Sequence, residues 1–184
     1  ITGNVSLGAS GSFTINSGSS ISGTINGGGS MNIASGITYN TNSNIGNSSA
    51  LALISVGANS NLNAATANSA INATVISLNS GSIFRLGTAA FTGTVQGATN
   101  NSGIVNVTQN LVSNGNFGAA SHALATVNIS ANRSLNIATN NNSINAAAIN
   151  LGSGSTLTIG NSAVTGIIDG TIANAGTLNL TDDN

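Results

Sequence analysis

Six side chains in the sequence can carry a charge near neutral pH, and they are scattered between residue 85 and the C-terminal end. They are Arg85, Arg133, His122, Asp169, Asp182 and Asp183. Glycosidic bond hydrolysis needs two positioned carboxyl groups. Asp182 and Asp183 are adjacent near the C-terminal end, so Asp169 has no predictable partner. His122 belongs to no Ser-His-acid arrangement that a sequence can reveal. We therefore expect a protein that is not an enzyme and has no catalytic residues.

The same inventory argues against metal ions, cofactors and nucleic acid. The sequence has no cysteine for a thiolate site, and glycine-rich calcium repeats need an aspartate in every nine-residue unit. Nucleic acid is bound by neutralising its phosphates with several basic residues, but this chain has two arginines and a net charge of −1. The run Gly27–Gly29 lacks the Gly-Lys-Ser/Thr sequence of a phosphate loop. We expect no metal-binding residues, no cofactor and no nucleic-acid partner.

The composition predicts a folded chain with an unusual surface. Charged residues are 3% of the sequence, against about 25% in an average globular protein. The polar residues are mainly Asn, Ser, Thr and Gly. Hydrophobic residues make up 40%, which is enough for a core and argues against disorder. No apolar run reaches the length of a membrane-spanning helix. The sequence has no initiator methionine and no signal peptide, so we expect a piece of a longer protein.

The elements that must position these side chains are indicated by an internal repeat. When the sequence is shifted by 73 positions, residues 50–110 align with 123–183 without a gap, and 27 of the 61 pairs are identical. The apolar positions match as well, for example Leu62 with Leu135 and Ile76 with Ile149. Self-similarity at a fixed period is typical of stacked arrays. We therefore expect residues 73 positions apart to share an inner column of the array.

Within the repeat, apolar–x–apolar triplets alternate with turns rich in Gly, Ser and Asn. Ile76–Leu78 and Phe84–Leu86 form such a pair, and Ile149–Leu151 and Leu157–Ile159 form another. Alternation with period two predicts strands with one buried face, and Gly and Asn tolerate the positive φ of tight turns. The near absence of Glu, Lys and Gln gives a helix little support.

From residue 54 onward, within the two clear repeat units, successive pairs of triplets start 22 or 29 positions apart. The shorter step allows three short strands and three turns, which is one coil of a parallel β-helix. The longer step predicts a larger coil, with protrusions near 98–104 and 171–177. We expect about seven or eight coils. A sandwich or barrel of hairpins remains an alternative, because Asn26-Gly27 and Asp169-Gly170 are hairpin turn sequences.

The prediction divides a single β-helix segment into three units. Residues 1–49 follow the repeat less closely and form a degenerate or capping unit, residues 50–122 form one repeat unit, and residues 123–184 form a truncated one. Stacked asparagines can form hydrogen-bonded ladders. The expected ladder positions are the pairs Asn59 and Asn132, Asn63 and Asn136, Asn72 and Asn145, and Asn101 and Asn174.

Two segments carry a resemblance to a known family. FTGTVQGATNNSGIVNV (91–107) and VTGIIDGTIANAGTLNL (164–180) share the form T-G-x-[IV]-x-G, a gap, and an apolar–Asn–apolar strand. They resemble the recurring unit of autotransporter passenger domains, most closely those of rickettsial outer-membrane surface antigens. The resemblance implies a right-handed β-helix, secreted and exposed on the surface of a Gram-negative bacterium. It transfers no binding residue, because none lies in a matching motif.

These observations lead to one main expectation about function. The resemblance implies a surface passenger that projects and presents an adhesive surface, with a host-cell protein or the extracellular matrix as partner and no membrane insertion of this segment. The alternative is a structural surface-layer or filament component that self-associates through its coil ends, because truncated stacks expose unpaired strand edges. A polysaccharide-cleaving β-helix would need a second acid or a base close to Asp169. Thr92–Thr94 and Thr156–Thr158 do not recur in every coil, as an ice-binding face would require.

Overall fold

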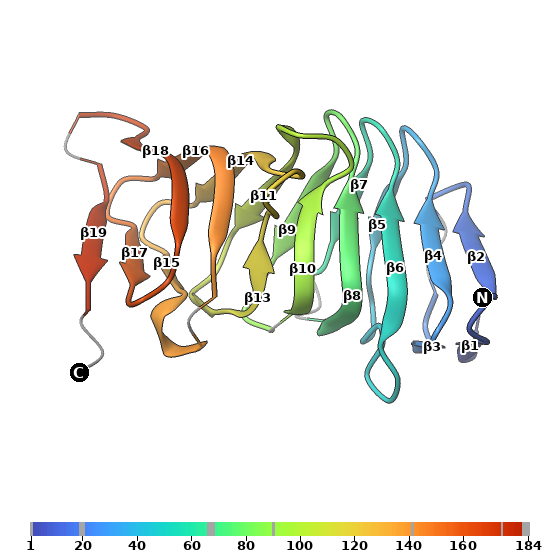
Figure 1. The fold of residues 1–184 in the computed structure, drawn as a ribbon. Coiled ribbons are helices and arrows are strands. Elements are labelled where there is room, and N and C mark those ends of the chain that lie inside the picture. Colours follow the sequence, from blue (N-terminus) through green and yellow to red (C-terminus); the bar gives the residue numbers. More distant parts are fainter. Residues whose placement is uncertain are drawn as a thin grey trace.

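The computed structural model describes residues 2–18, 21–65, 69–89, 91–140, 142–173 and 175–181. Short strands follow one another around a common axis and build a β-solenoid of about eight turns (Figure 1). All strand pairs between described residues are parallel, apart from one antiparallel bridge between Ala119 and His122. The described part of the chain contains one helical turn, the 3-10 helix Ala138–Asn140. The predicted parallel solenoid is confirmed, and the hairpin-based alternative is wrong.

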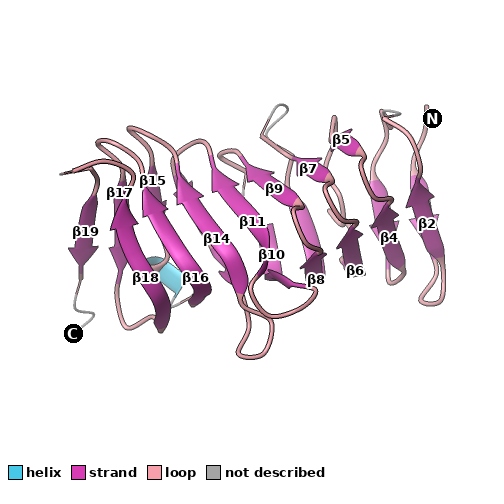
Figure 2. Ribbon diagram, turned by 90° about the horizontal axis from the view of Figure 1, so that it is seen from above, coloured by secondary structure: helices cyan, strands magenta, loops and turns pink. Residues whose placement is uncertain are grey.

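Each turn of the solenoid passes through three walls. The first wall contains β2 (Ser12–Ile15), β4 (Ser30–Ile33), β6 (Leu51–Val56), β8 (Ile71–Leu78), β10 (Phe91–Gly97) and β13 (Asn114–Phe117). The second wall contains β5 (Thr38–Asn40), β7 (Asn61–Asn63), β9 (Ile83–Leu86), β11 (Ser102–Val107), β14 (Leu124–Ile129), β16 (Ile144–Leu151) and β18 (Val164–Gly170). Strands of this wall lie side by side in Figure 2. The third wall follows the second along the chain and contains β1 (Val5–Leu7), β3 (Ile25–Gly27), β12 (Leu111–Val112), β15 (Ser134–Asn136), β17 (Thr156–Ile159) and β19 (Thr177–Leu180).

Four long strands turn a corner and belong to two walls. The first residue of β8 pairs with Ile45, on the third wall, while its later residues pair with β6 on the first wall. Similarly, β16 begins beside Phe117 on the first wall and continues beside β14 on the second. In both cases the ladder to the next strand, β10 or β18, shifts register at the corner. Such bulges bend the strand and let it fold around the core.

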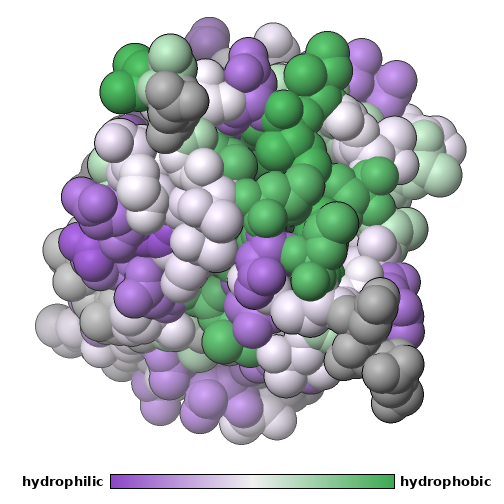
Figure 3. Space-filling model, turned by 90° about the vertical axis from the view of Figure 1, so that its left-hand side faces the viewer, coloured by the Kyte–Doolittle hydropathy of each residue, from purple (hydrophilic) through white to green (hydrophobic). Residues whose placement is uncertain are grey.

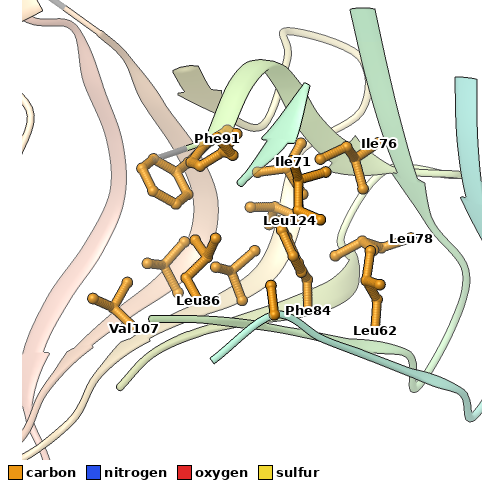
Figure 4. Packing of buried hydrophobic residues seen from close by; sticks show 14 of the residues in the cluster. Leu62, Ile71, Ile76, Leu78, Phe84, Leu86, Phe91, Val107 and Leu124 are labelled. Carbon is orange, nitrogen blue, oxygen red and sulfur yellow. The ribbon is translucent and has the colours of Figure 1, made fainter. Parts of the chain in front are cut away.

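Inward-pointing side chains of successive turns line up in columns, one or two on each wall, and these columns form the core. On the second wall Leu62, Phe84, Val105, Val127 and Ile149 are in register and have no solvent exposure. Each member of this column lies one turn after the previous one. Figure 4 shows Leu62 and Phe84 of this column among other buried side chains that fill the interior. The first-wall column starts in β2 and β4, so the chain before residue 50 continues the same stack.

Three phenylalanines fill the middle of the solenoid. Phe84 and Phe91 pack edge to face with ring centroids 6.2 Å apart, and Phe91 and Phe117 do so at 5.2 Å. All three rings are fully buried. Phe84 lies on the second wall, Phe91 begins β10 beside Ile71 of the third wall, and Phe117 ends β13 on the first wall. Edge-to-face geometry is a favourable arrangement of aromatic pairs. The rings therefore connect the three walls across successive turns.

The expectation that residues 73 positions apart share a column is wrong. Leu62 lies on the second wall and Leu135 on the third, in register with Leu157. Ile76 lies on the first wall and Ile149 on the second. The chain passes from Ile76 to Phe84 on the next wall, and three whole turns then lead from Phe84 to Ile149. The repeat is thus three turns plus one wall.

Local conformation nevertheless repeats faithfully from one repeat unit to the next. The strands β8 and β16 have the same length and the same pattern of buried positions. Asn59 and Asn132 adopt left-handed turns with φ of 54° and 56°. All three walls are parallel ladders with one inward face, so the same apolar–x–apolar sequence can serve on any of them. The solenoid therefore tolerates a repeat that does not match a whole number of turns.

Two further expectations about the coils are corrected by this geometry. The longer step, from Ile76 to Val105, is one turn plus one wall and not a larger coil. The expected protrusion at 98–104 is a short turn followed by buried positions of β11. The expected protrusion at 171–177 includes Asn174, which lies outside the described residues, and stays a prediction; residues 171–173 are exposed. The expected asparagine pairs are not ladder partners either: Asn63, for example, bonds Asn40 one turn away, and Asn174 lies outside the described residues.

Candidate binding surface on the second wall

The outer side of the second wall carries one polar column along seven turns. Because side chains alternate across a strand, the residue after each buried position points outward. The strand registers place these outward residues in one line, which consists of Asn40, Asn63, Arg85, Asn106, Asn128, Asn150 and Asp169. We call this line the amide ladder, because five of its seven members are asparagines.

Side-chain hydrogen bonds join successive amides of the ladder. The Nδ2 of Asn63 donates to Oδ1 of Asn40 at 2.8 Å, that of Asn128 to Asn106 at 2.8 Å, and that of Asn150 to Asn128 at 2.9 Å. Each amide donates toward the N-terminal end of the solenoid. An asparagine has both donor and acceptor atoms, so the column can propagate from turn to turn in this one direction.

The two charged members interrupt the ladder. Arg85 lies between Asn63 and Asn106, but a guanidinium has no acceptor for the amide of Asn106. Asp169 follows Asn150 in the column, but a carboxylate has no hydrogen to donate to Oδ1 of Asn150. Within the described residues the guanidinium of Arg85 forms no hydrogen bond or ion pair. The ladder thus presents one unpaired cation in its middle and one carboxylate at its end.

Arg85 and Asp169 are too far apart to pair with each other. Four turns separate them, which is about 19 Å at the usual spacing of neighbouring strands. This exceeds the Debye length of about 8 Å at physiological ionic strength. In the sequence the charged residues are scattered, and Asp169 has no predictable partner. The structure places Arg85 and Asp169 in one column, a relationship that the alignment of the two repeat units could not show.

A second outward column runs beside the amide ladder and is largely apolar. From β9 to β18 it consists of Ile83, Ile104, Thr126, Ala148 and Ile167. The first four are partly exposed, and Ile167 is 70% exposed. The outer side of the second wall therefore presents a column of amides and, beside it, a largely apolar column. Such a surface can make hydrogen bonds and apolar contacts with the same partner.

The remaining candidate residues do not join this surface. His122 lies in the loop between β13 and β14, where its backbone carbonyl accepts a 3.0 Å hydrogen bond from the Gly97 amide. Its Nδ1 is buried without a hydrogen-bond partner among the described residues. Arg133 occupies the turn before β15, and its backbone amide donates to Ser130 at 3.1 Å. Asp182 and Asp183 lie outside the described residues.

No described segment brings acidic, histidine or cysteine side chains together. The described residues contain no group of three or more His, Cys, Asp or Glu side chains that could hold a metal ion. Among the titratable groups of these residues, the one with a clearly displaced pKa is Tyr39 in β5, where burial raises the pKa of the phenol. Tyr39 is 2% exposed and belongs to the core.

Comparisons with known proteins do not identify a family. The part of the chain that the structure describes contains no helix with the length and hydrophobicity needed to cross a membrane. No protein-family model, no curated protein and no solved structure matches the chain.

Proposed function

We propose that the chain is a non-enzymatic segment of a bacterial cell-surface passenger, whose solenoid projects and presents an adhesive surface to host cells or matrix. The proposal is supported by the resemblance of residues 91–107 and 164–180 to autotransporter passenger repeats. Under this proposal the segment lies outside a Gram-negative cell, and the solenoid holds binding side chains away from the membrane.

The observation that carries the proposal is the outer side of the second wall. There the unpaired guanidinium of Arg85 interrupts the amide ladder between Asn63 and Asn106, next to the partly exposed Ile83 and Ile104. Departures from local regularity concentrate at functional sites. Because arginine adds charge and donors where an asparagine would extend the ladder, Arg85 is the expected contact with a partner that offers a carboxylate or carbonyl group.

Binding of the chain to cultured mammalian epithelial cells and to matrix-coated wells tests this function. Arg85→Asn should weaken binding by about 10–100-fold, because a hydrogen bond to a charged group contributes about 1.5–3 kcal/mol. Arg133→Asn is the matched control, since it removes the same charge from a turn outside the ladder. The proposal is wrong if the unaltered chain binds neither surface, or if both variants lose binding equally.

A further inference from the structure

Where charged residues interrupt the amide ladder, two of its asparagines keep a polar group without a partner among the described residues. Nδ2 of Asn106 has no acceptor there, because Arg85 precedes it in the column. Oδ1 of Asn150 has no donor there, because Asp169 follows it. The guanidinium and the carboxylate are also unpaired among these residues. The column therefore has two free donor groups at one end and two free acceptor groups at the other.

These four groups are arranged symmetrically about Asn128. In the order of the turns, the column reads Arg85, Asn106, Asn128, Asn150 and Asp169. The free donors lie one and two turns before Asn128, and the free acceptors lie one and two turns after it. Asn128 itself both donates and accepts within the ladder. Such a column is complementary to a copy of itself that runs in the opposite direction.

We propose that the outer side of the second wall binds the same surface of a second copy of this chain. The two-fold axis of the dimer runs along β14, so the two solenoids point in opposite directions and their strands in the same direction. Arg85 of each copy then faces Asp169 of the other copy, and Asn106 faces Asn150. Each of these contacts forms twice, and every free donor of the column meets a free acceptor.

The apolar column beside the ladder fits the same arrangement. In the order of the turns it reads Ile83, Ile104, Thr126, Ala148 and Ile167. Thr126 lies on β14, on the axis, and the two-fold places Ile104 over the smaller Ala148 and Ile83 over Ile167. Packed sheets lie about 10 Å apart and keep their strand directions within about 30° of each other. Apolar contacts therefore accompany the polar ones.

Charge selects this orientation over the other face-to-face dimer. A two-fold axis along the solenoid would place Arg85 over Arg85 and Asp169 over Asp169, so both contacts would be repulsive. The chain has two basic and three acidic residues, and the second arginine, Arg133, lies in a turn outside the wall. Few other charges can therefore offset the preference for solenoids that point in opposite directions.

The contact lies along the side of the solenoid. In Figure 2 the strands β9, β11, β14, β16 and β18 lie next to one another on this wall. The wall is separate from the end of the molecule seen in Figure 3, where hydrophobic residues gather. Further turns stacked on either end of the solenoid would not cover it. Five strands give a surface about 24 Å across and about 20 Å along the strands. Both copies together would bury roughly 1,000 Å², the lower limit for a specific interface, so the dimer should be weak.

Sedimentation equilibrium of charge variants tests the contact. The unaltered chain should form a dimer and nothing larger, because a two-fold contact closes on itself. Arg85→Asp and Asp169→Arg should each weaken dimerisation at least about tenfold, since two attractive pairs become two repulsive ones. An equimolar mixture of these two variants should dimerise again, because both contacts then join opposite charges. Arg133→Asp makes the same charge change outside the wall and should dimerise like the unaltered chain.

Crosslinking locates the axis. The chain has no cysteine, so single cysteines can be introduced as reporters. Thr126→Cys lies on the axis, and a thiol crosslinker about 10 Å long, the separation of packed sheets, should join its two copies. Thr38→Cys is the matched control, because it lies in the same column four turns away. Its two copies would be about 38 Å apart and should not be joined.

Any one of four results would contradict this dimer. They are an unaltered chain that stays monomeric up to about 1 mM, growth beyond two copies, a mixture of the charge variants that does not dimerise, and equal crosslinking of Thr38→Cys and Thr126→Cys. Circular dichroism confirms that each variant keeps its β-structure, and Arg85→Glu replaces Arg85→Asp if that variant does not.

The dimer does not rest on the proposed adhesive function, since it is measured without cells or matrix. A chain that dimerises but binds neither surface would refute the adhesive function alone. A chain that binds them and stays monomeric would refute this dimer alone.

Discussion

Replacing Asn128 by alanine measures the contribution of the amide ladder to stability. Asn128 is the member that both donates to Asn106 and accepts from Asn150, at 2.8 and 2.9 Å. Alanine removes both hydrogen bonds. The net contribution of one hydrogen bond is about 0.5–1.5 kcal/mol, so the free energy of unfolding should fall by about 1–3 kcal/mol. The amides are only partly buried, which places the expected value in the lower half of this range.

Urea denaturation of matched variants provides the assay. Asn106→Ala removes one ladder bond and should cost about half as much as Asn128→Ala. Asn179 is the counterpart of Asn106 in the next repeat unit, but it lies exposed on β19 and outside the ladder. Its replacement by alanine should change stability by less than about 0.5 kcal/mol. A double-mutant cycle between Asn128 and Asn150 isolates their coupling. Equal losses for Asn106, Asn128 and Asn179, with no coupling, would refute the ladder as a stabilising element.

Three further predictions concern the core and its turns. Gly93→Ala should lower the free energy of unfolding by at least about 2 kcal/mol, because φ is +90° and the added Cβ would clash with the backbone oxygen of Ala73. Gly8→Ala is the control, since its added Cβ would have no other atom within 4 Å. This variant should be close to neutral in the same urea titration. Phe84→Ala should lower the unfolding free energy by about 3–5 kcal/mol, since the ring is fully buried in the aromatic cluster, and a loss below about 1 kcal/mol would contradict this packing. Burial raises the pKa of Tyr39, so the folded state holds the phenol proton more tightly than the unfolded state does. The free energy of unfolding should therefore fall as the pH rises above about 10, the pKa of an unfolded tyrosine. Tyr39→Phe should abolish that fall, and the ultraviolet absorbance of the phenolate reports the titration directly because the chain has one tyrosine.

Sequence reasoning predicted what depends on a single strand and its turns. The triplets Ile76–Leu78 and Phe84–Leu86 are strand segments whose apolar members face the core, because period-two alternation determines which face is buried. Asn59 has the positive φ that its place in a turn predicts. These properties depend on near neighbours in the chain, which the sequence displays directly.

What the sequence did not reveal is which strands lie on top of one another. The apolar–x–apolar pattern is the same on all three walls, so it contains no mark of wall identity. The column partner of Asn63 is Asn40. To pair these two residues from the sequence alone, one would need to know how many residues make up the solenoid turn between them. In the alignment of the two repeat units Arg85 lies opposite Thr158 and Asp169 lies opposite Gln96. That alignment gives no sign of the column that Arg85 and Asp169 share, which only the strand registers show.

The one-wall offset of the repeat determines the directions in which repeated side chains point. Each step of the repeat advances by three and a third turns, which amounts to about 16 Å along the axis and a third of a revolution about it. A side chain present at the same position of every unit would therefore face three azimuths in succession and return to the first after three units. A long array of such units would therefore present the repeated side chain on all three walls and could bind partners on every side. If the repeat were a whole number of turns, the repeated side chain would lie on one wall only.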